Sequence, residues 1–235
     1  MFVLRPIYLL SFLFLGPLCS QAKDLRTNEV WMSGAPSWLK RVRIEKVTDK
    51  IQRKLEWSTR RVEVKWHSTA ESFQKAHSLG PIPSAVTVST AQNQTIHMSP
   101  KVQDRNFDQI FAHELVHVII FQKYRGAIPK WLEEGLANHL SQSQKVDYLW
   151  LSQQELPQDV SLVAHPYKGS PKSVTVQYKV SQALIEMLES KCDLENLIRL
   201  SVQRKMADYI KTYCEIPDLN KSFKDWLQKK TKFKK

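Results

Sequence analysis

Two fragments of the chain contain residue types that could bind a metal ion and activate water. The first is HELVH, residues 113 to 117, and the second is WLEEGLA, residues 131 to 137. Side chains four residues apart lie on one face of a helix, so His113 and His117 could each direct an imidazole nitrogen at one ion. Glu114 would then project over the open side of that ion, where a carboxylate can take a proton from water. The spacing therefore predicts a catalytic zinc site with Glu114 as general base.

A catalytic zinc site also needs a third protein ligand while it leaves one position to water. A carboxylate from a second helix is one known solution, and the second fragment offers two adjacent candidates, Glu133 and Glu134. Spacing alone does not choose between them. Gly135 costs a helix about 1 kcal/mol relative to alanine, and we interpret it as allowing the two helices to approach closely enough for the carboxylate to reach the metal.

The segment that carries the first fragment predicts a buried helix. Asn106 followed three residues later by Gln109 is typical of a helix start, and the apolar residues that follow extend nearly all round the helix. Gly126 predicts the end of this helix, and Pro129 predicts the first turn of the next one, which carries Trp131 to Leu140. The polar side chains of the first helix therefore need partners in the interior.

The remaining periodicities predict a mixed α and β chain. Residues 37–57 have the spacing of an amphipathic helix, and residues 60–68 alternate as a half-buried strand does. No internal repeat or linker is evident, so we expect residues 23–235 to form one unit with two lobes. Further strands are expected at 85–89 and 94–98, a short helix near 70–78, and C-terminal helices near 176–190, 193–203, 204–213 and 218–229.

Together, HELVH and WLEEGLA are similar to the motifs of the gluzincins, and in particular to small bacterial proteins with a peptidase MA-like domain. The resemblance covers roughly residues 85 to 230. It implies an α+β zincin fold, thermolysin-like, with a small N-terminal mixed sheet and helices, a zinc helix and a helical C-terminal lobe. In that family the Glu immediately before the Gly is the third ligand, which corresponds to Glu134. The resemblance therefore implies one zinc ion per chain on His113, His117 and Glu134.

The resemblance also implies a candidate residue for the oxyanion. The helical lobe of the family often opens with a Tyr-x-x-Ser stretch, here Tyr178 to Ser181, and in related gluzincins a tyrosine from this region stabilises the oxyanion. The alternative for Tyr178 is a partly buried aromatic residue at a helix start. The exopeptidase branch carries a GAMEN-type stretch before the zinc motif, and residues 87–100 contain nothing comparable. We therefore expect an endopeptidase, in which this stretch is an edge strand that pairs with an extended peptide.

The predicted function is a secreted zinc-dependent metalloendopeptidase that acts on a peptide or protein. Two alternatives stay open. One is a catalytically silent binding module with the same fold, and the other is a zinc amidase that acts on cell-wall material. Five further histidines lack ligand spacing with one another and are interpreted as surface or structural residues: His67, His77, His97, His139 and His165.

The first 22 residues predict a cleaved signal peptide. Arg5 is their only charged side chain, an apolar run extends from Ile7 to Leu18, and the small residues Ser20 and Ala22 suit a signal peptidase. A membrane anchor is the alternative, but the apolar run is short for a membrane span. We therefore expect an exported protein, periplasmic or secreted, that begins after Ala22.

Charge and cysteine content add two expectations. The formal net charge is +12, and the signal peptide accounts for one positive charge of that total. Solvated helix faces and a soluble tail explain most of it, and electrostatic contact with an anionic cell-envelope surface is the alternative. Export argues against a nucleic-acid partner, and we expect a monomer. Without Cys19, the pair Cys192 and Cys214 could form a disulfide in an oxidising compartment, or remain two buried thiols.

Overall fold

The structure is a computed structural model, and it describes residues 22–90, 93–142, 145–163, 169–202 and 205–232. The predicted signal peptide up to residue 21 and His165 lie outside these ranges. In chain order, the elements of the N-terminal half are β1 (Lys23–Arg26), β2 (Val30–Ala35), α1 (Arg41–Leu55), β3 (Val62–Trp66), α2 (Ala70–Gln74), β4 (Ala85–Ser89), β5 (Gln94–Met98), η1 (Asp104–Asn106) and α3 (Phe107–Tyr124). Those of the C-terminal half are α4 (Lys130–Leu140), α5 (Tyr148–Ser152), η2 (Val160–Leu162), α6 (Pro171–Glu189), α7 (Leu194–Leu200), α8 (Met206–Thr212) and α9 (Leu219–Lys232).

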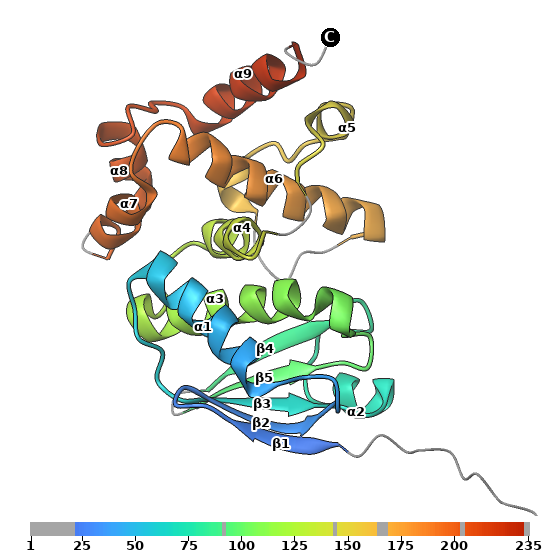
Figure 1. Cartoon of the computed structure of the whole chain (residues 1–235). Coiled ribbons are helices and arrows are strands. Elements are labelled where there is room, and N and C mark those ends of the chain that lie inside the picture. The colour runs from blue at the N-terminus through green and yellow to red at the C-terminus, as the bar shows by residue number, and fades with distance from the viewer. Residues whose placement is uncertain (1–21, 91–92, 143–144, 164–168, 203–204, 233–235) are drawn as a thin grey trace, which may run out of the picture.

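The N-terminal half is a mixed five-stranded sheet with two helices packed on one of its faces (Figure 1). The strand order is β1-β2-β3-β5-β4, with β2, β3 and β5 parallel and with β1 and β4 antiparallel to their neighbours. Alternate side chains of the central strands, such as Val64 and Ile96, are fully buried beneath α1 and α3. The strand order places β4 at an edge of the sheet, and β4 contacts α3.

The predicted α+β class, with a small N-terminal mixed sheet followed by helices, is confirmed. The strands expected at 85–89 and 94–98 are β4 and β5, and the amphipathic helix is α1. The strands β1 and β2 were not predicted. β1 has only four residues, of which Leu25 alone is apolar, and β2 includes Gly34, so the sequence shows no clean apolar alternation at either strand. The helix expected near 70–78 is shorter, because α2 ends at Gln74.

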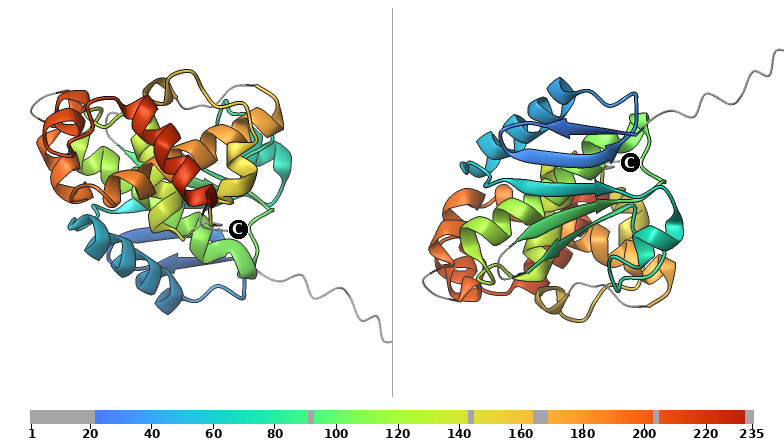
Figure 2. Two further views of the ribbon diagram at one scale, coloured as in Figure 1. Left: turned by 90° about the horizontal axis from the view of Figure 1, so that it is seen from above. Right: turned by 90° about the horizontal axis from the view of Figure 1, so that it is seen from below.

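The C-terminal half contains only helices among its described elements, and α4 packs against both α3 and α6 (Figures 1 and 2). The longest of them, α6, begins earlier than predicted because the Ser170 hydroxyl accepts a hydrogen bond from the Ser173 backbone N–H and Pro171 suits a first turn. The predicted Cys192–Cys214 disulfide is confirmed, and it joins the segment after α6 to the segment after α8.

The predicted start of α3 is confirmed, and two other helix boundaries need correction. Asn106 is the N-cap of α3, although its side-chain oxygen accepts a hydrogen bond from the Gln103 N–H and so closes the preceding η1 turn. Pro129 is the N-cap of α4 rather than a residue of its first turn. The stop predicted at Gly126 occurs slightly earlier, since α3 ends at Tyr124 and Arg125 has a φ of 55°.

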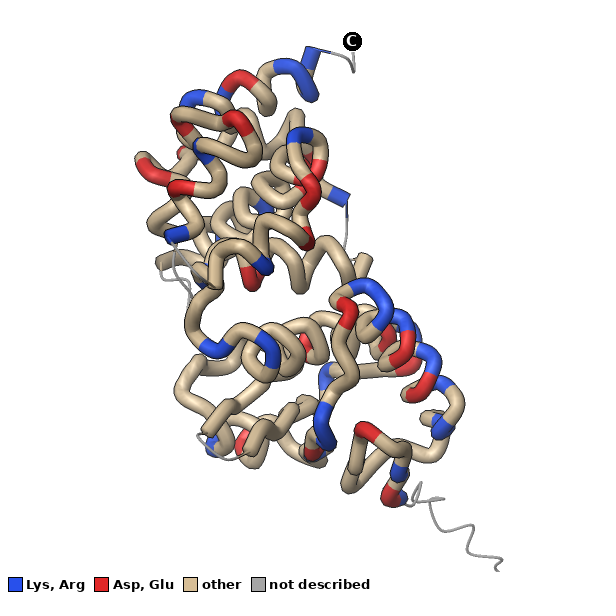
Figure 3. The backbone as a smooth tube through the Cα atoms, turned by 90° about the vertical axis from the view of Figure 1, so that its left-hand side faces the viewer, with Lys and Arg blue, Asp and Glu red and all other residues tan. Residues whose placement is uncertain are grey.

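Charged side chains of both signs are spread over both halves, with Lys and Arg prominent along α1 and at the end of α9 (Figure 3). Part of the α1 charge is paired, since Arg43 forms ion pairs with Asp104 and Asp108. Contact with an anionic surface therefore stays a prediction. In the described part of the chain, no helix is both long and apolar enough to cross a membrane.

Candidate metal centre

Helix α3 places the HELVH fragment between the sheet and the C-terminal helices. It contacts α1 and β4 on one side and α4 on the other. Fully buried side chains, among them Phe111 and Leu115, fix its rotation about its axis. As a result His113 and His117, which are only partly buried, face a pocket, and Glu114 is buried beside them with 5% of its surface exposed.

The structure brings together His113, His117 and Glu134. The two Nε2 atoms are 3.1 Å apart, and the Glu134 carboxylate oxygens lie 3.6 Å from Nε2 of His113 and 3.5 Å from Nε2 of His117. A tetrahedral ion with bonds of about 2 Å holds its ligand atoms about 3.3 Å apart. The three observed separations bracket that value, so this group could hold a metal ion.

Glu133 occupies a different position from Glu134, although the two are neighbours in sequence. Its Oε1 atom lies 2.8 Å from Nδ1 of His117, and its Oε2 atom accepts a hydrogen bond from Lys130 Nζ at 2.6 Å. Because a carboxylate can only accept here, Nδ1 of His117 donates to Glu133, which leaves Nε2 as the nitrogen available to an ion. Glu133 therefore orients His117, and Glu134 faces the space that an ion would occupy.

The charges around this group favour a cation. Burial raises the pKa of Glu134 to about 7. His117 acts against this shift, and the carboxylates of Glu133 and Glu114 act in the same direction as burial. Burial also raises the pKa of Glu114 above its usual range. Buried carboxylates are costly unless a positive charge compensates them. A divalent cation between the imidazoles and Glu134 would supply that charge.

Glu114 is held by a residue that the sequence analysis did not identify. The hydroxyl of Thr87 on β4 donates to Oε2 of Glu114 at 2.7 Å and lies 3.3 Å from its backbone oxygen. The hydrogen bond fixes one carboxylate oxygen against the edge strand. No sequence signal links Thr87 to Glu114, because the contact depends on how β4 packs against α3.

The pocket beside the group has a volume of about 320 Å³. Tyr178 lines it together with His113, Glu114 and Glu134, so the structure places this candidate at the same site. Burial raises the pKa of Tyr178, and Glu134 and Glu114 raise it further, so the hydroxyl remains a donor at neutral pH. Tyr178 lies well within α6 rather than at a helix start.

Gly135 is explained by a different pair of helices from the one expected. A Cβ atom at this position would lie 2.4 Å from the backbone oxygen of Ser181 and 2.6 Å from a side-chain carbon of Ile185, both on α6. The interpretation that this glycine lets α4 approach α3 is therefore wrong. It lets α4 approach α6, and this contact brings Tyr178 over the same pocket.

The other histidines lie away from this group. His139 pairs with Glu189 at 3.2 Å, and His67 contacts His97 with 2.9 Å between ring nitrogens. Among the residues that the structure describes, only one group of three or more His, Cys, Asp or Glu side chains has ligand atoms close enough to share a metal ion. That group is His113, His117 and Glu134.

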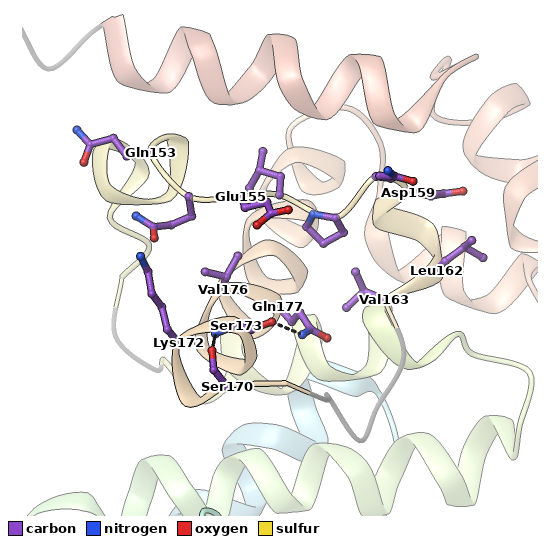
Figure 4. Close-up of a pocket in the computed structure, with 14 residues that line it drawn as sticks. Gln153, Glu155, Asp159, Leu162, Val163, Ser170, Lys172, Ser173, Val176 and Gln177 are labelled. Carbon is purple, nitrogen blue, oxygen red and sulfur yellow. Dashed lines mark hydrogen bonds between the residues drawn. The ribbon is translucent and has the colours of Figure 1, made fainter.

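A larger hollow of about 920 Å³ lies beside the first turns of α6 (Figure 4). Its lining combines amides and hydroxyls, such as Gln153, Gln177 and Ser173, with apolar groups such as Val176. Neither the metal-binding group nor Glu114 nor Tyr178 lines it. The predicted chemistry therefore belongs to the smaller pocket.

Comparison with known proteins adds no further information on this site. No protein-family model matches the chain, and neither a curated protein nor a solved structure matches it significantly. The assignment of function consequently depends on the geometry described above.

Proposed function

We propose that this chain is a zinc-dependent metalloendopeptidase. The observation that carries the proposal is the convergence of His113, His117 and Glu134 beside the buried carboxylate of Glu114. Two imidazoles and one carboxylate are a ligand set used by catalytic zinc sites, and it leaves a position for water or substrate. A structural zinc site would fill all four positions with protein groups.

Zinc in such a site acts as a Lewis acid that polarises a carbonyl and lowers the pKa of water. Glu114 would take the proton from the attacking water and later give it to the leaving amine. The hydrogen bond from Thr87 leaves the other carboxylate oxygen of Glu114 for this transfer. Burial raises the pKa of Glu114, which makes its carboxylate a stronger base for this transfer.

Two further groups would support the reaction. Glu133, itself bonded to Lys130, keeps the Nε2 lone pair of His117 directed at the metal position. Tyr178 would donate a hydrogen bond to the oxyanion that develops on the substrate carbonyl. Its raised pKa keeps the proton on its hydroxyl at working pH.

A peptide is the substrate class that fits this surface best. β4 is an edge strand and also lines the pocket, so an extended backbone could pair with it and place a carbonyl near the metal position. The pocket walls include apolar side chains that are half-buried or exposed, such as Ile82, Phe121 and Val174, and a substrate side chain would cover them.

The test combines metal analysis with one substitution. Purified protein should contain one zinc ion per chain and hydrolyse unstructured proteins, and a chelator should abolish the hydrolysis. Glu114→Gln keeps the shape of the side chain and every ligand, but its amide cannot accept the proton. Zinc content should therefore stay unchanged while turnover falls by about a hundredfold or more.

The same experiment separates the two alternatives. A protein that binds zinc, cleaves no protein and releases products from cell-wall fragments would be an amidase. A protein that binds zinc and hydrolyses neither substrate would be a binding module. Wild-type protein that binds no zinc would overturn the proposal itself.

A further inference from the structure

Segment 67–84 connects β3 to β4 and includes α2 (Figure 1). Three imidazoles lie close together where this segment meets the sheet. His67 begins the segment, and its backbone N–H donates to the Met98 carbonyl at 2.9 Å. The ring of Phe73 on α2 is fully buried, with its centroid 5.8 Å from that of His67 and 4.4 Å from that of His77. In the histidine cluster, His67, His77 and His97, the first two therefore contact the apolar anchor of the segment and His97 contacts His67.

Hydrogen bonds assign the tautomers of two members of the histidine cluster. The Ser72 hydroxyl donates to the Thr69 carbonyl at 3.0 Å, so it must accept from Nδ1 of His67, 3.2 Å away. Nε2 of His67 then carries the lone pair and accepts from Nδ1 of His97 at 2.9 Å. His67 is therefore neutral in this arrangement, because its Nε2 must keep a lone pair. Protonating both rings would put two N–H groups face to face and break the contact.

The third imidazole is tied directly to the pocket wall. Nδ1 of His77 accepts a hydrogen bond from the Leu79 backbone N–H at 3.1 Å. A protonated imidazole has no lone pair, so acid would remove this bond. Leu79, Ile82 and Pro83 of the same segment line the pocket beside the metal-binding group.

Burial and nearby charges also lower the pKa values of the three imidazoles. Burial lowers the pKa of His97 to about 4, with His67 and Lys65 acting in the same direction and Glu63 against it. Burial also lowers the pKa of His67 and of His77. Lys65 and Glu63 are the charged side chains that β3 contributes, and β4 contributes none.

Other charged side chains belong to segment 67–84 or contact it. On α2 the Glu71 side chain is exposed. Lys101 donates to the Pro81 carbonyl at 2.6 Å, and this tether does not change when a histidine is protonated. The response of the segment to acid should therefore come from the three imidazoles.

We propose that the histidine cluster is an acid-sensitive latch, which holds segment 67–84 on the sheet at neutral pH and releases it when two or more of its imidazoles become protonated. Release would remove one wall of the pocket while the sheet and α3 remain folded. The consequence for catalysis, a weaker hold on substrate in acid, rests on the proposed function. The latch itself does not, so it is tested by a structural measurement.

Hydrogen exchange read by mass spectrometry tests the latch in full-length mature protein with chelator present. Peptides from segment 67–84 should lose protection by about tenfold or more between about pH 7.5 and about pH 5, after correction for the intrinsic exchange rate. Peptides from β5 and α3 should stay protected. In His97→Gln, which keeps a donor towards His67 but does not titrate, the loss should be clearly smaller. His139→Gln, which removes a histidine paired with Glu189, should behave as wild type.

If His97→Gln fails to fold at neutral pH, the same measurement is made on His77→Gln. This variant removes the imidazole that accepts the hydrogen bond from the Leu79 N–H and that loses its lone pair in acid. Unchanged protection of segment 67–84 in acid would overturn the proposal. So would a loss that β5 and α3 share, or an equal loss in wild type and in both variants. A protein that shows the latch but no hydrolysis would reject the proposed function and leave the latch standing.

Discussion

Two pairs of histidines in this chain hold ring nitrogens at nearly equal separations, and their surroundings differ. In the pair His113 and His117 the nitrogens are 3.1 Å apart, and in the pair His67 and His97 they are 2.9 Å apart. The first pair faces the carboxylate of Glu134. The second is joined by a hydrogen bond, with a serine hydroxyl, a third imidazole and a lysine close by.

The difference teaches that nitrogen spacing alone does not define a metal site. Carboxylates around the first pair favour a positive charge, and Glu133 fixes the tautomer that points a lone pair at the ion. Around the second pair, burial and Lys65 lower the pKa of His97 and so disfavour its protonation. Similar pairs of imidazoles are therefore suited to bind a metal in one place and to resist protons in the other.

The largest expected effect separates the two pairs by their metal affinity. Glu134→Ala removes a ligand, so zinc affinity, measured by competition with a chromophoric chelator, should fall by more than about a hundredfold. His97→Gln alters the other pair and should leave the affinity within about twofold of wild type. The comparison breaks down if Glu134→Ala binds zinc normally or if His97→Gln binds it poorly.

The sequence predicted the first pair because its geometry is local. Residues 113 and 117 lie on one helix, and the fixed helical repeat brings their side chains together without help from the rest of the fold. The position of Glu134 came from the resemblance, and the geometry places it beside both imidazoles. The α+β class and most helices also followed from local periodicity.

The second pair was not predicted, because His67 and His97 meet only through the pairing of β3 with β5. Thr87 was missed for the same reason, since its contact with Glu114 joins a strand to a helix. Gly135 was assigned to the wrong helix pair, because a glycine indicates close approach without naming the partner. Contacts across elements need the tertiary structure, and one sequence does not contain a periodic signal for them.

A smaller effect should follow from the carboxylate that orients His117. Glu133→Gln removes the charge but keeps an oxygen that can accept from Nδ1, so zinc affinity should fall by about tenfold to a hundredfold. Glu63→Gln is a matched control, because it removes a carboxylate near the second pair and should leave zinc affinity unchanged. If the two variants bind zinc equally well, Glu133 does not act on the metal through His117.

The smallest expected effect concerns stability in acid, measured with chelator present so that zinc loss does not contribute. The pKa of His97 is about 4 in the folded protein and 6.5 as an unperturbed side chain, so the unfolded chain binds the proton more readily. The stabilisation due to neutral His97 should thus be complete above about pH 6.5 and decline as the pH falls towards 4. Because this imidazole is only half-buried, solvent screens part of the effect.

Thermal unfolding at about pH 7.5 and at about pH 5 gives the measurement. The melting temperature of His97→Gln should fall by about 2–4 °C less than that of wild type between these conditions, because the variant has no imidazole to protonate at this position. His139→Gln should follow wild type, since its histidine belongs to a surface pair with Glu189. An acid response of His97→Gln equal to that of wild type would mean that the second pair does not resist protons, and the contrast with the first pair would then lie in metal affinity alone.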